Sequence, residues 1–220
     1  MLPAQEAVKK KDAQALENEL KTIEHSLDLI YKSLLRMPEY CDPYIYFNRV
    51  RPYIHGWKDH PGPPGGLIYD GVKEYQNKPQ SFRGQTGAQS SIIPSMDAAL
   101  GIVHKEDFMK HYLLEMRDYM PPGHKAFIEA LEQGPSIRKF VTEQMDHIQS
   151  LRQVYDKCVD WVEKFRTQHI EYAKNYIYKQ NETSASNPHA VGTGGTPFVP
   201  YLQKHRDETA EHILGKDHDS

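Results

Sequence analysis

The chain has 220 residues, of which 38% are hydrophobic and 26% charged, with a formal net charge of −3 and a mean hydropathy of −0.73. These values indicate a soluble globular protein built on one large domain. The slightly acidic balance argues against a nucleic-acid-binding protein, which needs a basic surface. No apolar run approaches the roughly 20 residues that a membrane span requires.

The N-terminus and the cysteines indicate the cellular setting. Residues 1–11 contain three lysines with no apolar stretch behind them, so they do not resemble a secretory signal. Cys41 and Cys158 are too few for a disulfide framework or a structural zinc site. We therefore expect a cytoplasmic protein with two reduced thiols.

The first predicted element is a helix from about Ala4 to Arg36. Its apolar residues recur at alternating steps of four and three, which places on one face Leu16, Leu20, Ile23, Leu27, Ile30 and Leu34. This seam is shorter than three heptads, so packing within its own domain is favoured over a coiled coil. We take residues 1–37 as an N-terminal helix and residues 38–220 as the main domain.

Residues 38–135 predict short helices between turns and loops. Residues 42–57 mix aromatic side chains with arginines, and the small, polar loop at 81–91 has the composition of segments that often line ligand sites. Proline and glycine punctuate the segment, and only short pieces such as residues 66–69 carry a strand signal. After an apolar segment at residues 92–103, helices are expected at residues 105–119 and 124–133.

The longest predicted helix begins at about residue 136 or 143, ends at residue 179, and carries a histidine on its apolar stripe. The stripe comprises Leu151, Tyr155, Cys158, Val162, Phe165, His169, Ala173 and Tyr176. His169 is thus expected to face the core, either bonded to a carbonyl or carboxylate or as a metal or haem ligand. After a polar loop at 180–196, a last helix at about 198–214 completes an all-α fold with long loops.

Two further features have both a functional and a structural interpretation. Arg51 lies one helical turn from Phe47 and suits a carboxylate ligand, although a surface arginine with its stem over aromatic rings is the commoner case. The loops at 84–91 and 192–196 offer backbone amides to an anion, although neither has a phosphate-binding spacing. The residues alone leave these alternatives open.

Six strings occur in collinear order and span the chain from about residue 38 to residue 214. They are RPYIHGW (51–57), GLIYDGV (66–72), FRGQTGAQSS (82–91), DAALGI (97–102), MRDYMPPGH (116–124) and GTGGT (192–196). Taken together they resemble the indoleamine 2,3-dioxygenases, fungal members most closely, and in particular the large helical haem domain of that family. The resemblance implies a b-type haem, molecular oxygen as co-substrate, and opening of the indole ring of L-tryptophan to N-formylkynurenine, on the kynurenine route toward NAD.

The resemblance also implies which residues surround the iron. His169, at the end of the string RTQH, matches the axial ligand, and Asp97 matches an acidic residue that orients the ligand ring. Thr86 and Arg166 match residues on the side of the haem propionates, and Gly87 matches a small residue over the haem face.

The substrate side follows from the same resemblance. Arg51 matches the arginine that holds the substrate carboxylate, with Phe47 and Tyr46 as the aromatic pair beside it. Family members often have phenylalanine where this chain has Tyr46. Thr193 matches a loop threonine that closes over the bound substrate.

One departure from the family concerns the N-terminus. The family has a smaller N-terminal domain that contributes part of the distal pocket, whereas here only the predicted helix precedes the main domain. We therefore expect haem binding with weak tryptophan oxidation, and the alternatives are a non-enzymatic haem or oxygen-binding protein of the same fold and a helical interaction protein without a cofactor. The oligomeric state is not indicated.

Overall fold

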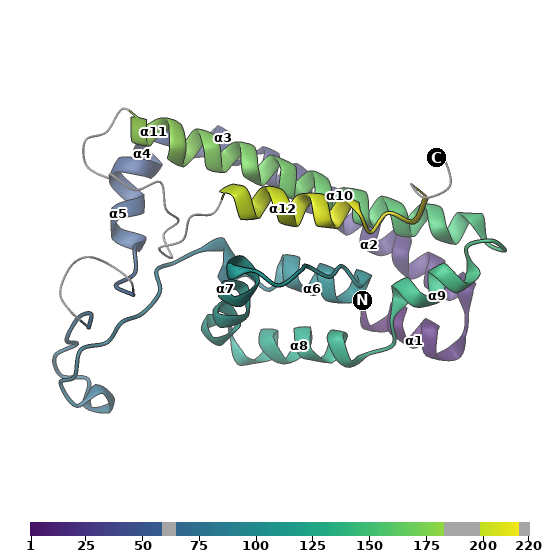
Figure 1. Cartoon of the computed structure of the whole chain (residues 1–220), viewed down its shortest axis with the longest axis horizontal. Helices are drawn as coiled ribbons and strands as arrows, with labels where there is room; N and C mark the ends of the chain where they lie inside the picture. The colour runs from purple at the N-terminus through teal and green to yellow at the C-terminus, as the bar shows by residue number, and fades with distance from the viewer. Residues whose placement is uncertain (59–64, 183–198, 216–220) are drawn as a thin grey trace. The chain divides into compact units, whose positions relative to one another are not determined.

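The computed structural model describes residues 1–58, 65–182 and 199–215, and in this part of the chain the regular structure is helical (Figure 1). The one β-type pairing among these residues is an isolated antiparallel bridge between Leu67 and Gln80, in the segment with the strand signal. The predicted all-α fold is therefore confirmed. None of the described helices is both long enough and apolar enough to cross a membrane.

Backbone contacts divide the described residues into two compact units. Unit 1 comprises residues 1–37, 88–169 and 202–215, and unit 2 comprises residues 38–58, 65–87, 170–182 and 199–201. Residues 1–37, predicted as a separate N-terminal element, group with later helices in unit 1, and their status as a domain stays a prediction.

Unit 1 holds the larger helices and the main hydrophobic core. Its elements are α1 (Leu2–Lys10), α2 (Ala13–Leu35), α6 (Ile92–Leu100), α7 (Phe108–Met116), a 3-10 turn (Arg117–Tyr119), α8 (Pro122–Gln133), α9 (Ile137–Gln144), most of α10 (Gln149–Ala173) and most of α12 (Val199–Ala210). The apolar seam of α2 and the first part of the α10 stripe are buried in one cluster. Cys158 of α10 contacts α2 directly, its thiol lying 3.4 Å from the carbonyl of Leu20.

Two predicted helices are each divided in the structure. Lys11 adopts a left-handed conformation with φ of 56°, and the Asp12 side chain then accepts a hydrogen bond from the amide of Ala15, so α1 ends and α2 begins where we predicted one helix. A turn at residues 145–148 separates α9 from α10, so the long helix does not begin at residue 136, and the alternative start at residue 143 is the nearer to the observed one. The prediction of a single helix was wrong at Lys11 and, for the earlier start, at residues 145–148, because a local cap or turn ends a helix without changing its apolar period.

Unit 2 consists of short helices, among them two π-helical segments. Its elements are α3 (Met37–Tyr40), α4 (Pro43–Ile45), a π-helix (Tyr46–Val50), α5 (Arg51–Ile54), a 3-10 turn (Lys73–Tyr75), a second π-helix (Lys174–Tyr178) and α11 (Lys179–Glu182). The two π-helices contact each other, and the rings of Tyr46 and Tyr176 meet edge to face at 5.9 Å.

The polar loop at residues 81–87 is bound tightly to the end of α5. The amides of Trp57 and Lys58 donate to the carbonyl of Phe82 at 2.9 and 3.1 Å, and the amide of Gln85 donates to the carbonyl of Ile54 at 2.9 Å. Gly56 permits this approach, because a Cβ there would lie 2.0 Å from the backbone nitrogen of Gly84. The loop is thus fixed against the helix that carries Arg51.

Replacing Gly56 with alanine should therefore lower the free energy of unfolding by roughly 1–3 kcal/mol, the usual cost of forcing an extra carbon into a packed site. Gly87→Ala is the matched control in the same loop, because no described atom lies within 4 Å of its Cβ. Urea denaturation of the two variants and the parent measures the difference. Equal midpoints for the two variants would show that the close approach at Gly56 is not required.

Candidate functional site

His169 lies at the one place where the buried stripe of α10 opens. Leu151, Tyr155, Cys158 and Val162 are buried, then Phe165 is half-buried and His169 exposed, and the stripe is buried again at Ala173 and Tyr176. The expectation that His169 faces the packed core was therefore wrong. The stripe is apolar in sequence but accessible to solvent at His169.

The electrostatic state of His169 suits a metal ligand. The pKa of His169 lies below its ordinary value, first because surrounding protein disfavours the charged ring and then because Arg166 is one turn away. No hydrogen bond to the ring occurs among the residues that the structure describes, so the alternative of a core histidine bonded to a carbonyl or carboxylate finds no partner there. A neutral imidazole with an available nitrogen is what iron ligation requires.

Asp97 and Arg166 form a two-pronged ion pair between α6 and α10. Arg166 Nη1 and Nη2 donate to the two carboxylate oxygens at 3.0 and 2.7 Å. Burial alone would raise the pKa of Asp97, but the charge of Arg166 and its hydrogen bonds to the carboxylate bring it to about 2. No described hydrogen bond joins Asp97 to the ring of His169. The Asp97 carboxylate therefore restrains Arg166 and, through Arg166, the turn of α10 that carries His169.

The guanidinium of Arg166 has two further partners. Nη1 donates to the hydroxyl of Thr209 on α12 at 2.9 Å, and Nη2 lies 3.2 Å from Nε2 of His104. α10 and α12 run side by side at this point (Figure 1). Both terminal nitrogens of Arg166 are thus engaged by protein groups, and its predicted position beside the haem propionates stays a prediction.

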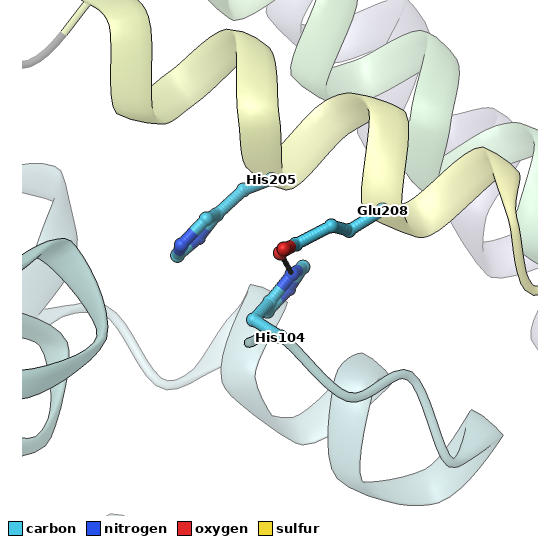
Figure 2. A group of neighbouring side chains, drawn as sticks. All are labelled: His104, His205 and Glu208. Carbon is cyan, nitrogen blue, oxygen red and sulfur yellow. Dashed lines mark hydrogen bonds and ion pairs between the residues drawn. The ribbon is translucent and has the colours of Figure 1, made fainter. Parts of the chain in front are cut away.

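The structure adds a buried cluster that the sequence analysis missed, formed by His104, His205 and Glu208 (Figure 2). His104 follows α6, whereas His205 and Glu208 lie three residues apart on α12. His104 Nδ1 is 2.9 Å from Glu208 Oε2, and the two imidazole rings are stacked with centroids 4.1 Å apart. The spacing of His205 and Glu208 on one helix face was the available sequence signal. Their partner His104 lies 101 positions before His205, so the spacing of residues in the sequence could not identify it.

In unit 2, three of the residues predicted for the substrate side lie together. Arg51 is 2% exposed, and its guanidinium carbon lies 5.4 Å from the ring centre of Phe47, which is also buried. Burial lowers the pKa of Arg51, and the neighbouring Tyr46 partly opposes this effect. Tyr46 is half-buried, and burial raises the pKa of its hydroxyl. The surface interpretation of Arg51 is therefore wrong, and a buried cation beside two aromatic rings is suited to an aromatic carboxylate.

Thr86 and Gly87 end the loop that is bonded to α5. Thr86 is half-buried, and Gly87 is exposed with open space where a side chain would project. Open space at Gly87 fits the predicted small residue over a flat cofactor. Thr193 lies outside the described residues.

The exposed ring of His169, which has no hydrogen-bond partner among the described residues, and the open space at Gly87 both fit a haem. Each observation belongs to a different unit, so each is a separate test of fit. Iron needs an imidazole nitrogen that carries no proton, and His169 can offer one. A residue without a side chain leaves room for a flat ring system, and Gly87 has that room.

Comparisons with known proteins identify the family. The family model described as indoleamine 2,3-dioxygenase matches residues 1–212. Indoleamine 2,3-dioxygenase 1 of Rattus norvegicus is 35% identical over 219 residues, covering 94% of this chain and 53% of the relative. Indoleamine 2,3-dioxygenase of Saccharomyces cerevisiae is 29% identical over 236 residues, covering 91% and 51%.

A third relative has a different name. A protein of Haliotis madaka named myoglobin is 33% identical over 180 residues, covering 80% of this chain and 46% of the relative. The chain thus spans about half the length of the curated relatives that it matches. Because the family model covers nearly all of the described residues, the chain belongs to the indoleamine 2,3-dioxygenase family.

Proposed function

We propose that the chain binds a b-type haem through His169 and acts in the oxidative opening of the indole ring of L-tryptophan by molecular oxygen, giving N-formylkynurenine. Enzymes of this family are haem-dependent dioxygenases. The observation that carries the proposal is the opening of the buried α10 stripe at a neutral, unpaired imidazole. A cytoplasmic location and a place in the kynurenine route toward NAD belong to the same proposal.

On the iron side, one residue is proposed to ligate the iron, and the others are proposed to position that residue or to contact the haem. The haem, when bound, supplies the activation of molecular oxygen for insertion into the C2–C3 bond of the indole. His169 offers the ligand nitrogen, and the Asp97–Arg166 pair fixes the helix turn that presents it. Thr86 and Gly87 are proposed to contact the propionates and the face of the macrocycle.

On the substrate side, Arg51 is proposed to bind the carboxylate of tryptophan. A guanidinium that is buried has lost much of its hydration, so a carboxylate beside it stabilises its charge strongly. Phe47 and Tyr46 offer ring surfaces to the indole, and Thr193 is proposed to close over it. No side chain of this set needs to take a proton from the substrate.

A second function is favoured by one observation, the relative named myoglobin. The same iron-side residues would serve a protein that binds haem and oxygen without oxidising tryptophan. Incubation of the haem-loaded chain with tryptophan, a reductant and ¹⁸O₂ separates the two functions. The dioxygenase predicts N-formylkynurenine carrying two labelled oxygens, whereas stable oxygen binding without labelled product supports the alternative.

His169→Ala should abolish stoichiometric haem binding, because no other ligand nitrogen is proposed at the iron. Added imidazole should restore a haem spectrum by entering the space that the side chain leaves. His111→Ala, at an exposed histidine of α7, is the control and should keep the parent's haem content. Parent-like haem content and absorption spectrum in His169→Ala would remove the residue from the site.

Arg51→Ala should lower kcat/KM for tryptophan by tens to thousands of fold at unchanged haem content. Loss of a buried charge partner costs about 2–5 kcal/mol, at about 1.4 kcal/mol per decade of rate. Arg49→Ala removes an exposed arginine two residues away and should leave kcat/KM within about twofold of the parent. An active chain that tolerates Arg51→Ala would contradict the assignment.

A further inference from the structure

The cluster of His104, His205 and Glu208 resembles a metal site in composition but not in geometry. Its donor atoms lie within 4.8 Å of one another, and two imidazoles with a carboxylate are a common zinc ligand set. However, the two rings are stacked with planes only 4° apart (Figure 2). A metal ion lies near the plane of each imidazole that binds it, so one ion cannot be ligated by both parallel rings.

Protein cations already lie on two sides of the cluster. Arg166 Nη2 lies 3.2 Å from His104 Nε2, and Lys204 Nζ lies 3.6 Å from Glu208 Oε1. The carboxylates of Asp97 and Asp107 lie 3.7 Å from His104 Nε2 and 3.5 Å from His205 Nε2, so the orientation of the rings, rather than the local charge, argues against a metal. The three residues are therefore part of a hydrogen-bonded network, and the partners of His104 indicate what the network does.

The two ring nitrogens of His104 face partners of opposite charge. Nδ1 is 2.9 Å from a carboxylate oxygen of Glu208, which accepts, so Nδ1 carries the hydrogen. Nε2 lies 3.2 Å from Arg166 Nη2 and 3.7 Å from Asp97 Oδ2, so its hydrogen-bond partner is Arg166, and because a guanidinium nitrogen only donates, Nε2 is the acceptor. The contacts thus assign a neutral ring that connects the negative Glu208 to the positive Arg166.

The His104 ring is held in this orientation from both ends and from one face. Burial alone would raise the pKa of Glu208, but the hydrogen bond from His104 and the charge of Lys204 lower it, so the acceptor stays ionised. The amide of Lys105 lies 3.4 Å from the second carboxylate oxygen. His205 is 3% exposed and covers the ring face, and burial and then the neighbouring His104 lower the pKa of His205 to about 4. A neutral His205 stacks without adding a charge beside Arg166.

We propose that His104 is a positioning residue for Arg166 and, through it, for the turn of α10 that presents His169. Arg166 has one fixed partner on each neighbouring element: Asp97 on α6, Thr209 on α12, and His104 between α6 and α7. Without the acceptor at Nε2, Arg166 Nη2 keeps only the Asp97 oxygen and gains freedom to rotate. The effect on haem rests on the proposed function, whereas the effect on Arg166 does not.

The test uses the full chain with three substitutions. His104→Leu removes the contacts with Glu208 and Arg166 and replaces the imidazole with an apolar side chain of similar volume. His104→Gln keeps an acceptor near the position of Nε2 and so should restore the contact with Arg166. His212→Gln is the matched control: His212 also joins α12 to the segment after α6, accepting from the amide of Val103 at 3.1 Å, but makes no hydrogen bond to Arg166.

Two measurements are made on each variant, with circular dichroism as the check on folding. In the haem-free protein, ¹⁵N NMR of the Arg166 guanidinium should give separate Nη signals in the parent, in His104→Gln and in His212→Gln, and averaged signals in His104→Leu. In the haem-loaded protein, His104→Leu should bind haem about 10–100-fold more weakly, the usual effect of losing an outer-shell partner. The iron–histidine stretching frequency in resonance Raman spectra should shift in the same variant alone.

The outcomes separate positioning from general stability. If His104→Leu leaves both the Arg166 signals and haem affinity unchanged, or if His212→Gln is equally damaging, the proposal is overturned. Should His104→Leu fail to fold, His104→Gln decides: retained Arg166 signals support the proposal and averaged signals overturn it. If the parent binds no haem, the proposed function fails by itself, and the NMR comparison still decides whether His104 positions Arg166.

Discussion

The burial of one face of α10 is the constraint on which the site depends. Its first part packs into the main core with α2, and each fully buried large apolar side chain there contributes about 1.5–3 kcal/mol. That packing fixes the rotation of the helix about its axis. The opening at Phe165 and His169 is tolerable because buried residues lie on both sides of it. The Asp97–Arg166 pair orients the Arg166 side chain but adds little net stability. The attraction within a buried ion pair is roughly offset by the desolvation cost of its two charges.

The helices were predictable from the sequence wherever apolar period and turn residues agreed. The structure places α7, α8 and α12 within the predicted ranges or a few residues of them, and α6 lies in the apolar segment at 92–103. The divisions at Lys11 and at residues 145–148 were missed because a single left-handed residue or short turn interrupts hydrogen bonding without disturbing periodicity. The π-helices were missed for a related reason. A π-turn differs from an α-turn in its hydrogen bonding, and the amino-acid composition of the segment does not reveal that difference.

The site was predictable only in part. Periodicity placed His169 on the stripe but could not distinguish a packed face from a face with space beside it. The pairing of Asp97 with Arg166 spans 69 positions, and that of His104 with Glu208 spans 104, so both depend on tertiary packing that local patterns do not encode. His169 and its supporting network lie in unit 1, whereas Thr86, Gly87 and the aromatic and arginine group lie in unit 2. A haem protein and a dioxygenase could therefore share the network of unit 1 and differ in the aromatic and arginine group of unit 2.

The π-helix at Tyr46–Val50 makes this region tolerant of a change in the length of the chain. A π-turn contains one residue more than an α-helical turn, and Arg51 follows it directly. Loss of one residue from Tyr46–Val50 would therefore allow a regular α-helix that completes about the same rotation with one residue fewer. Arg51 would keep its direction relative to the preceding turn, whereas side chains within the turn would change faces. A single insertion or deletion here is thus a route by which the surroundings of the arginine could change while the arginine itself stays in place.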